Sequence, residues 1–242
     1  MGVIKDRETV RYFDEHVPEY NLERLEHVVE AIERVGGQQP SLVDIGCGAG
    51  NTLAFLKEQA RLGEVCGIDV SEQCLRKTRE RVEGQTHCGS ILDSAFLREI
   101  DARFHFALLS AVLHHLIGRT RRESRRYAEL AIANAAELLK PGGYLIVQEP
   151  VYYPILAMDS LFYVKKLLTK VTAERVTIFN EWNNIGPPVV SYYTNEQLIE
   201  MVEAGGRNEI VAKWIEPECL APALRPLLNK TNTTLVVRPR GA

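Results

Sequence analysis

The residues whose types and spacing point most directly to chemistry are the glycines of Gly46-Cys47-Gly48-Ala49-Gly50. Glycine has no Cβ, so a backbone of this kind can turn tightly and let a ligand approach closely. Asp69 follows 19 residues after Gly50, at the end of the next apolar segment. A carboxylate in that place can accept hydrogen bonds from both ribose hydroxyls of an adenosine. The pattern therefore predicts a site for an adenosine-containing cofactor.

Two details of this segment argue against a nicotinamide cofactor. The dinucleotide fingerprint is G-x-G-x-x-G, whereas this chain has G-x-G-x-G, with Asn51 in place of the third glycine. Asp44 also ends the apolar segment before the glycines, and a carboxylate so close to a pyrophosphate would be repelled by it. In that position Asp44 can instead hold a loop or, through water, a ligand ammonium. A generic nucleotide-binding domain is the alternative interpretation.

A parallel sheet is needed to position these residues. Five nearly continuous apolar segments alternate with helical patterns, and strands are expected over 42–45, 65–69, 86–88, 104–109 and 144–147. Such strands are typical of a parallel sheet that is covered by helices on both faces. Ligands of these sheets bind beyond the carboxyl ends of the strands, which is where the glycines lie.

The rest of the chain is expected to complete one domain of 242 residues around this sheet. Residues 1–39 are predicted to form an N-terminal helical cap, and 40–150 the cofactor-binding core. The alternation stops after Pro150, and 151–193 are rich in aromatic residues with no clear period, which indicates an insertion over the sheet edge. Regularity returns in 194–242, with a helix over 194–204 and strands near 209–215 and 233–238.

Three motifs, in order along the chain, resemble those of class I S-adenosylmethionine-dependent methyltransferases. They are residues 43–51, the segment Ser110-Ala111-Val112-Leu113-His114-His115-Leu116 after the fourth strand, and Leu138-Leu139-Lys140-Pro141-Gly142-Gly143-Tyr144-Leu145 before the fifth. The resemblance covers roughly 40–150 closely and 194–238 loosely. It implies an α/β, Rossmann-like, seven-stranded and mostly parallel sheet with helices on both faces and an antiparallel C-terminal strand pair. It also implies S-adenosyl-L-methionine as cofactor, with S-adenosyl-L-homocysteine as product.

The same resemblance implies which residues contact the cofactor. Asp69 would bind the ribose, and the adenine would lie near Val70 and Ser90. Many relatives have Asp directly after the glycine at position 89, whereas this chain has Ser90, with Asp93 three residues later. Either of these two could meet the adenine amino group. The expected cofactor-binding residues are Asp44, Gly46, Gly48, Asn51, Asp69, Val70, Ser90, Ile91 and Ser110.

A base for the methyl acceptor is expected on neighbouring strand ends, because methyl transfer often requires removal of a proton. His114 and His115 follow the fourth strand, and Glu149 ends the fifth, so one histidine could meet Glu149 and become more basic. The arrangement resembles the His–Glu pair of polyketide C-methyltransferase domains, which implies His114 as base and Glu149 as its partner. The alternative is that Leu113-His114-His115-Leu116 is the ordinary start of a helix, with His115 packed or capping.

The aromatic insertion at 151–193 is predicted to be the substrate lid. Its aromatic and amide side chains suit a small polar-aromatic or sugar-bearing acceptor, although packing of a helical cap explains at least half of them. Tyr12, Phe13 and Tyr20 resemble an N-terminal segment that closes over the cofactor; packing of the first helix is an equal alternative. The candidate acceptor-binding residues are Tyr12, Tyr20, His115, Tyr152, Trp182 and Asn183.

Charge and cysteine content exclude several other classes. The net charge of −3 and pI of about 6.1 give no overall basic field for a nucleic acid. Arginines are dense only over 119–126, which indicates a solvated helix face or, alternatively, a site for RNA phosphate or an anionic acceptor. Five cysteines without a C-x-x-C pair argue against disulfides and structural zinc and favour the cytoplasm. No apolar run long enough to span a membrane and no metal motif is present, so we expect neither membrane nor metal.

The leading prediction is therefore methyl transfer to O, N or C of a small molecule. One alternative is an RNA or protein methyltransferase that uses the arginines of 119–126. Another is a cofactor-binding scaffold or a non-methylating enzyme. The chain could form a homodimer, which the sequence does not decide.

Overall fold

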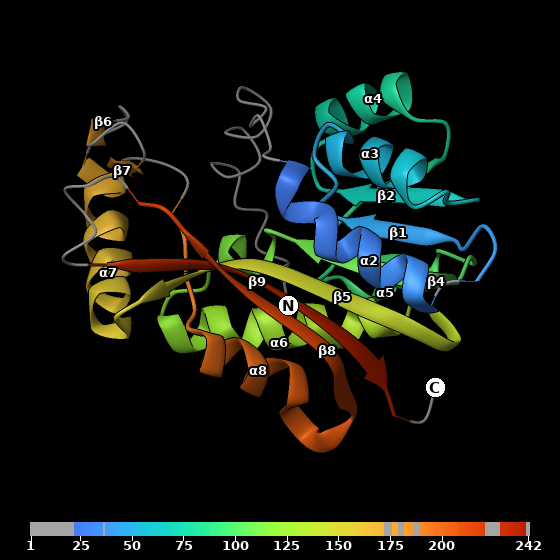
Figure 1. The fold of residues 1–242 in the computed structure, drawn as a ribbon. Helices are drawn as coiled ribbons and strands as arrows, with labels where there is room; N and C mark the ends of the chain where they lie inside the picture. The colour runs from blue at the N-terminus through green and yellow to red at the C-terminus, as the bar shows by residue number, and fades with distance from the viewer. Residues whose placement is uncertain are drawn as a thin grey trace.

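A seven-stranded sheet runs through the computed structural model, which describes residues 22–35, 37–171, 176–178, 182–185, 189–220 and 228–240 (Figure 1). The strand order is β3-β2-β1-β4-β5-β9-β8. The first five strands are parallel, β9 is antiparallel to β5, and β8 is antiparallel to β9. The strands are β1 Leu42–Ile45, β2 Val65–Asp69, β3 Gln85–Cys88, β4 Phe104–Ser110, β5 Leu139–Tyr153, β8 Asn208–Glu218 and β9 Asn229–Pro239. The predicted fold class is confirmed.

Helices cover both faces of the sheet, because the parallel strands are buried on both sides. One core contains side chains of α6 and α8, such as Ile132 and Met201, and the other contains Ile32 of α2 and Leu53 of α3. In Figure 1, α6 and α8 accordingly lie on the opposite side of the sheet from α2 and α3. The helical segments are η1 Leu22–Leu25, α2 Glu26–Val35, α3 Asn51–Gln59, α4 Glu72–Arg81, α5 Ser94–Arg98, η2 Leu113–His115, α6 Arg121–Ala136, α8 Asn195–Glu203 and η3 Ala204–Gly206.

The fifth strand is longer than predicted. Leu139 already pairs with Phe104 of β4, and regular pairing resumes at Tyr144 opposite Phe106, so the intervening residues 140–143 bulge from the register. At the other end, β5 continues to Tyr153, opposite Asn229. The predicted strand over 144–147 is therefore too short, since β9 supplies hydrogen-bond partners that the local sequence does not reveal.

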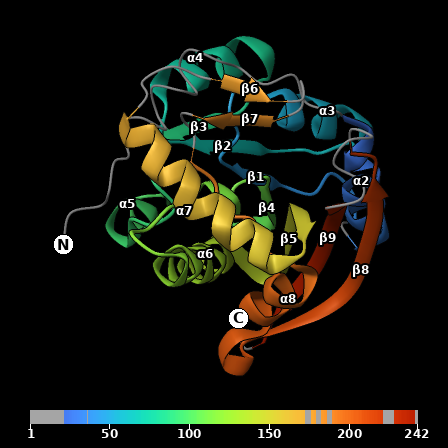
Figure 2. The same cartoon turned by 90° about the vertical axis from the view of Figure 1, so that its left-hand side faces the viewer.

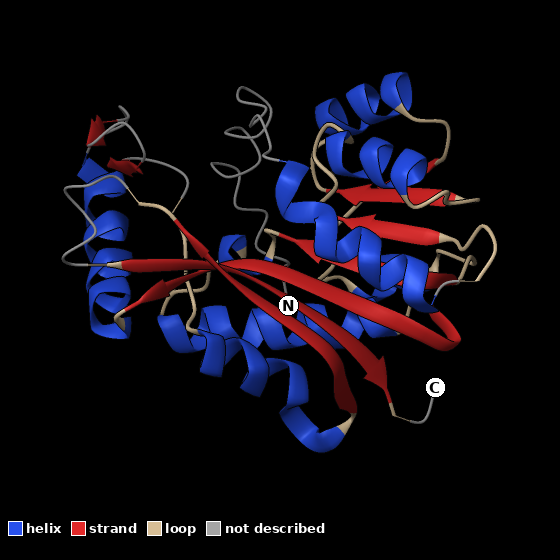
Figure 3. Cartoon of the chain, viewed as in Figure 1, coloured by secondary structure: helices blue, strands red, loops and turns tan. Residues whose placement is uncertain are grey.

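The insertion is mainly one helix, α7 Ile155–Val171, followed by the short strands β6 Val176–Ile178 and β7 Trp182–Ile185. β6 and β7 form a separate antiparallel pair, which lies next to α7 (Figure 3). Since β5 runs toward α7, the helix lies on the carboxyl side of the sheet (Figure 1). Figure 2 shows it crossing in front of the strand ends. After the insertion the chain comes back to the sheet, where Tyr193 forms an isolated parallel β-bridge with Val151.

Two observations concern the predictions on the chain's ends and on membranes. Tyr12, Phe13 and Tyr20 lie outside the described residues. In the described part of the chain, no helix combines the length and the apolar character needed to cross a membrane.

Candidate functional site

The glycine turn leaves β1 in a conformation that favours glycine. The φ angles of Gly46, Gly48 and Gly50 are 74°, 54° and 76°, in the left-handed region. A Cβ on Gly46 would lie 2.6 Å from Cγ2 of Val112, so this position also needs glycine for packing. A Cβ on Gly48 would meet no described atom within 4 Å. The turn is thus packed at Gly46 against the segment between β4 and η2, and it has room at Gly48.

Asp69 holds the turn in place. Its Oδ2 accepts the N–H of Gly48 at 2.9 Å, and its Oδ1 accepts the N–H of Ser71 at 2.9 Å. The Ser71 side chain in turn caps α4 by accepting the N–H of Cys74. A carboxylate has about four lone-pair sites, so Asp69 keeps acceptor capacity for the ribose hydroxyls that the resemblance assigns to it.

Asp44 is a buried carboxyl group, only 2% exposed, at the end of β1. Among the described residues, its Oδ2 has no hydrogen-bond partner. Burial, reinforced by the charge of Asp69, raises the pKa of Asp44 to about 8. Because an unsatisfied buried acceptor is costly, this oxygen fits a ligand that brings a donor or a positive charge. The donor set is therefore consistent with the methionine end of S-adenosylmethionine.

The segment after β3 contains both polar candidates for the adenine. Asp93 Oδ1 accepts the N–H groups of Ala95 and Phe96, so its carboxylate caps α5. Ser90 Oγ accepts the N–H of Leu92 at 3.2 Å, and within the described part of the chain its hydroxyl hydrogen has no acceptor. Val70, by contrast, is 45% exposed at the end of β2. Ser90 is thus the better placed of the two polar candidates.

Ser110 and Asn51 have different surroundings. The Ser110 hydroxyl donates to Gln148 Oε1 at 2.9 Å, and Gln148 Nε2 donates to Thr234 and to the carbonyl of Arg24. The Ser110 side chain therefore belongs to a network within the sheet, which sequence reasoning missed. Asn51 begins α3 directly after the turn. Ile91, also expected at the adenine, is buried.

His114 of η2, shortly after β4, meets Glu149 of β5, which directly follows the last β5 residue paired with β4. The His114 Nδ1 lies 2.6 Å from Glu149 Oε2, and both residues are buried. Glu149 Oε1 also accepts the N–H groups of Val112 and Leu113, at 2.7 and 2.6 Å. These three hydrogen bonds can stabilise a negative charge on Glu149 although the side chain is buried. His114, not His115, is thus the histidine that contacts Glu149.

The electrostatics of the pair favour a neutral imidazole. Burial lowers the pKa of His114 to about 3, with a further contribution from the positive charges of Arg24, Lys165 and Lys230, so the predicted rise in basicity is wrong. Burial raises the pKa of Glu149 to about 7, against the hydrogen bonds from Leu113 and Val112. An ionised Glu149 can only accept hydrogen bonds, so the His114 proton lies on Nδ1. The lone pair is then on Nε2, which no described residue hydrogen-bonds.

Aromatic side chains surround the imidazole. The ring centroids of His114 and His115 are 4.0 Å apart, and the Tyr192 ring stacks on His114 at 5.1 Å. Tyr152, a candidate acceptor residue, lies 4.3 Å from Tyr192 and is buried with Met158, Leu220 and Leu228. Its ring thus packs beneath the lid. Trp182 and Asn183 lie in β7, and their side chains are outside the described part.

Val112 joins the glycine turn to the His–Glu pair. Its side chain packs against Gly46, and its N–H donates to Glu149. The residue before it, Ala111, has a φ of 58°, a left-handed conformation that is uncommon for a residue with a Cβ. A backbone reversal at this point turns the following N–H groups toward Glu149. Neither residue was predicted as part of the site, because the groups by which they orient Glu149 belong to the backbone.

The arginines of 119–126 are partly committed to internal contacts. Arg121 bonds Asp159 of α7, and Arg125 bonds Glu129 and Glu200 of α8. Arg122 and Arg126 are exposed. In the described ranges, no group of three or more His, Cys, Asp or Glu side chains is arranged to hold a metal ion.

Comparison with known sequences relates the chain to methyltransferases. Residues 43–145 match a family model described as a methyltransferase domain. The chain is also 33% identical to trans-aconitate 2-methyltransferase of Acidovorax ebreus over 133 residues, which are 54% of this chain and 46% of that protein. The chain thus spans about half the length of this curated relative.

Solved structures show the same fold over nearly the whole chain. An S-adenosylmethionine-dependent methyltransferase from Clostridium acetobutylicum has a TM-score of 0.61 at 12% identity, covering 98% of this chain and 99% of that one. Magnesium protoporphyrin IX methyltransferase from Synechocystis, solved with bound S-adenosylhomocysteine, has a TM-score of 0.57 at 14% identity, covering 98% and 88%. At these identities the similarity concerns the fold alone.

Proposed function

We propose that this chain is a class I S-adenosylmethionine-dependent methyltransferase that methylates a small molecule with His114 as general base, because residues 43–145 match a methyltransferase-domain model and the fold is that of such enzymes. The methyl group goes to an oxygen, nitrogen or carbon atom of the acceptor, and Glu149 orients the base. The observation that carries this proposal is the 2.6 Å contact between His114 and Glu149, next to the glycine turn.

The glycine turn would hold the cofactor. The unpaired Oδ2 of Asp44 suits the ammonium of the methionine end, Asp69 the ribose, and Ser90 and Ile91 the adenine. When bound, the cofactor supplies a methyl group on a sulfonium, which an acceptor displaces in line. The room at Gly48 supports this placement, since a ligand can approach the backbone there without a Cβ between them.

The His–Glu pair prepares the acceptor. With Nδ1–H donated to Glu149, Nε2 can take a proton from an acceptor O–H, N–H or acidic C–H. The imidazolium that forms is stabilised by the adjacent carboxylate. The negative charge left on the acceptor is favoured by Lys165 and Lys230, whose charges act on the same imidazole. His115, packed against His114, belongs to the wall of this site.

A small-molecule acceptor is supported by the relatives, since trans-aconitate and magnesium protoporphyrin IX are both small molecules. We place the acceptor between the strand ends and α7, with 151–193 as lid and 1–39 as cap around one domain. Tyr152 and Tyr192 supply aromatic surface next to the base.

Titration with S-adenosylhomocysteine and a turnover assay test the proposal separately. We expect Asp69→Asn to weaken S-adenosylhomocysteine binding, because its amide nitrogen cannot accept the N–H of Gly48 or a ribose hydroxyl. The exposed Asp101→Asn is the matched control. We expect His114→Gln to leave that binding within about twofold but to lower turnover by about 100-fold or more, the usual contribution of a general base.

Turnover is measured as S-adenosylhomocysteine released with a panel of hydroxy, amino, carboxy and carbon-acid acceptors. Binding without release for every acceptor would instead favour a scaffold or a non-methylating enzyme. RNA as acceptor is favoured only if Arg122→Glu and Arg126→Glu abolish a steeply salt-dependent RNA affinity, because these two arginines are exposed. A turnover unchanged in His114→Gln would remove the base assignment.

A further inference from the structure

Arg121 is a cation at the N-terminus of α6, where a positive charge does not stabilise the helix. It is the first residue of α6, directly after the cap Thr120, whose side chain accepts the N–H of Glu123. The N-terminus of a helix carries a partial positive charge, so a cation there is unfavourable. The reason for an arginine at this position therefore lies in what its side chain contacts.

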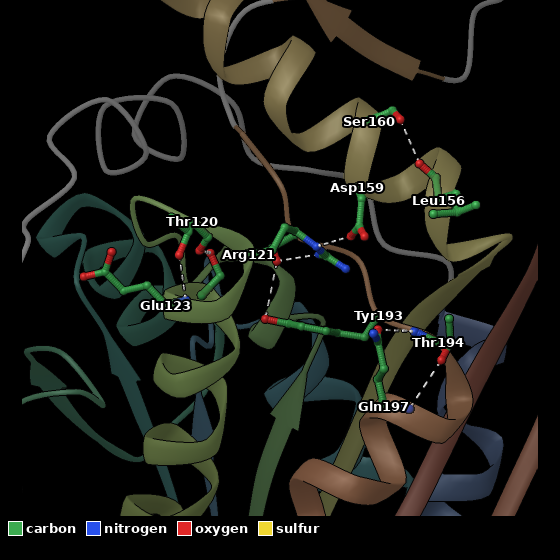
Figure 4. Close-up of polar contacts among 11 residues, drawn as sticks. Thr120, Arg121, Glu123, Leu156, Asp159, Ser160, Tyr193, Thr194 and Gln197 are labelled. Atoms are coloured by element: carbon green, nitrogen blue, oxygen red, sulfur yellow. Dashed lines mark hydrogen bonds and ion pairs between the residues drawn. The ribbon is translucent and has the colours of Figure 1, made fainter.

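The Arg121 guanidinium makes three contacts with other parts of the fold. Its Nε donates to Asp159 Oδ1 of α7 at 2.9 Å, and its Nη1 donates to Ser191 Oγ at 2.6 Å. The guanidinium carbon also lies 5.2 Å from the ring centroid of Tyr193. Figure 4 shows Arg121 between Asp159 above and Tyr193 below. The arginine side chain is only 12% exposed, so water screens these contacts weakly.

The segment 191–193 connects Arg121 to His114. The N–H of Ser191 donates to the carbonyl of His114 at 2.8 Å, and the Tyr192 ring stacks on the His114 imidazole. Arg121 thus contacts the side chains of Ser191 and Tyr193. His114 contacts the backbone of Ser191 and the ring of Tyr192, which lies between these two residues in the chain. A shift of Arg121 would move the surface on which the imidazole rests.

The other side of this arrangement is α7. Asp159, Phe162 and Lys166 have the spacing of one helix face, and Phe162 is buried. The Lys166 ammonium donates to the carbonyls of Gly118 and Arg119, at 2.7 and 2.9 Å. The helix α7 is therefore bound at two places: Lys166 bonds the turn before α6, and Asp159 bonds Arg121, the first residue of α6.

We propose that Arg121 is a positioning residue that couples the docking of α7 to the orientation of His114. With Asp159 bound, the guanidinium holds Ser191 and Tyr193, and these keep the imidazole aligned with Glu149. When α7 departs, Asp159 leaves the guanidinium and the alignment loosens. The inference rests on the proposed function for its effect on turnover, but the coupling itself is a property of the fold.

Arg121→Met tests the coupling, since methionine keeps much of the apolar stem and removes the charge and the donors. The exposed Arg122→Met, one residue later, is the matched control. In ¹H–¹⁵N spectra we expect Arg121→Met to shift or broaden the His114 Nδ1–H signal, which reports the bond to Glu149. Arg122→Met leaves that signal in place. With an acceptor from the panel, kcat falls about 10- to 100-fold, as for a small misplacement of a reacting group. Affinity for S-adenosylhomocysteine changes less than about twofold.

Two milder variants test the same contacts in case Arg121→Met does not fold. Asp159→Asn alters only the half-exposed end of the ion pair, and Ser191→Ala removes the hydroxyl that accepts from Arg121 and donates to Tyr193. Each is expected to shift the same Nδ1–H signal by less than Arg121→Met does. Adding Asp159→Asn to Arg121→Met should have no further effect, because the two residues act through one contact.

The inference is overturned if folded Arg121→Met keeps the wild-type Nδ1–H signal, or if the effects of Asp159→Asn and Arg121→Met simply add. Failure of the proposed function looks different. If His114→Gln retains full turnover, His114 is no base, yet the spectra still decide whether Arg121 orients its ring.

Discussion

At the scale of single residues, the site depends on which groups carry protons. Glu149 is buried with three hydrogen-bond donors, and burial raises its pKa to about 7. His114 is held neutral by burial. The proton between them therefore sits on the imidazole only while Glu149 is ionised. Protonated Glu149 would donate to Nδ1 and move the imidazole proton to Nε2, where the base needs its lone pair.

We therefore expect kcat to fall as the pH drops through about 7. The sign follows from the raised pKa: Glu149 is ionised above this value and protonated below it. Rates of S-adenosylhomocysteine release between pH 5.5 and 9 measure the profile. Glu149→Gln should lower kcat by about 100- to 10,000-fold at all these pH values, because an amide N–H facing Nδ1 fixes the wrong tautomer.

The exposed Glu80→Gln on α4 is the control for that substitution. A Glu149→Gln variant with the wild-type profile would show that another group titrates.

At the scale of elements, the ends of helices and strands place the functional groups. α8 is fixed by a full capping box: the Thr194 side chain accepts the N–H of Gln197, and the Gln197 side chain accepts the N–H of Thr194. The helix then buries Leu198, Met201 and Val202 against the sheet. It follows directly on 191–193, so its cap also fixes the segment that supports His114.

Thr194→Ala is expected to lower the free energy of unfolding by about 1 kcal/mol, the usual value of a lost N-cap. In a chain of this size that corresponds to roughly 2–4 °C in Tm. Thermal unfolding followed by circular dichroism measures it, and Thr194→Ser, which keeps the hydroxyl, should stay near wild type. An equal loss in both variants would mean that the cap hydrogen bond is not the cause.

Element prediction from sequence succeeded where local patterns and tertiary environment agree. The strands at 42–45 and 65–69 matched the structure because buried parallel strands are continuously apolar. β5 was predicted too short at both ends. Its last residues, Pro150 to Tyr153, are strand because β9 pairs with them, and that partner lies about 80 residues away in sequence. The bulge at 140–143 likewise depends on the register with β4.

The candidate site was predictable to a similar extent. His114 and Glu149 were expected to meet because neighbouring parallel strands end at one edge. Val112 and Ala111 were missed because their contribution is a backbone direction, which residue type does not encode. Lys165 was missed because an aromatic-rich segment without a clear period hides which of its charges is buried. Arg121 was assigned to a basic run, since an ion pair with Asp159 is visible only after folding.

At the scale of the whole molecule, cofactor binding and stability are linked. Asp44 and Asp69 come from two neighbouring strands, and the turn between Gly46 and Gly50 joins β1 to α3. A ligand held by these elements binds the folded chain and not the unfolded one, so it stabilises the fold. The sheet that it stabilises also carries β5 and β9, on the far side of β4.

S-adenosylhomocysteine at 100 times its Kd should therefore stabilise the protein by about 2.7 kcal/mol. This corresponds to a rise in Tm of roughly 5–10 °C for a chain of this length. Differential scanning fluorimetry over a series of ligand concentrations measures the rise. Adenosine and methionine added together serve as control ligands. No rise at concentrations where calorimetry detects binding would mean that the ligand does not favour the native state.

Ala111 has a consequence for anyone who wishes to make the protein more robust. Its φ of 58° holds a peptide in a conformation that an L-residue avoids, beside the groups that orient Glu149. Replacement by glycine would relieve this strain. It would also give the backbone more conformational freedom, so the N–H groups of Val112 and Leu113 would be held less firmly toward Glu149. At this residue, a gain in thermal stability is thus expected to come with a less fixed orientation of Glu149. Both the Tm and the turnover of such a variant should be measured.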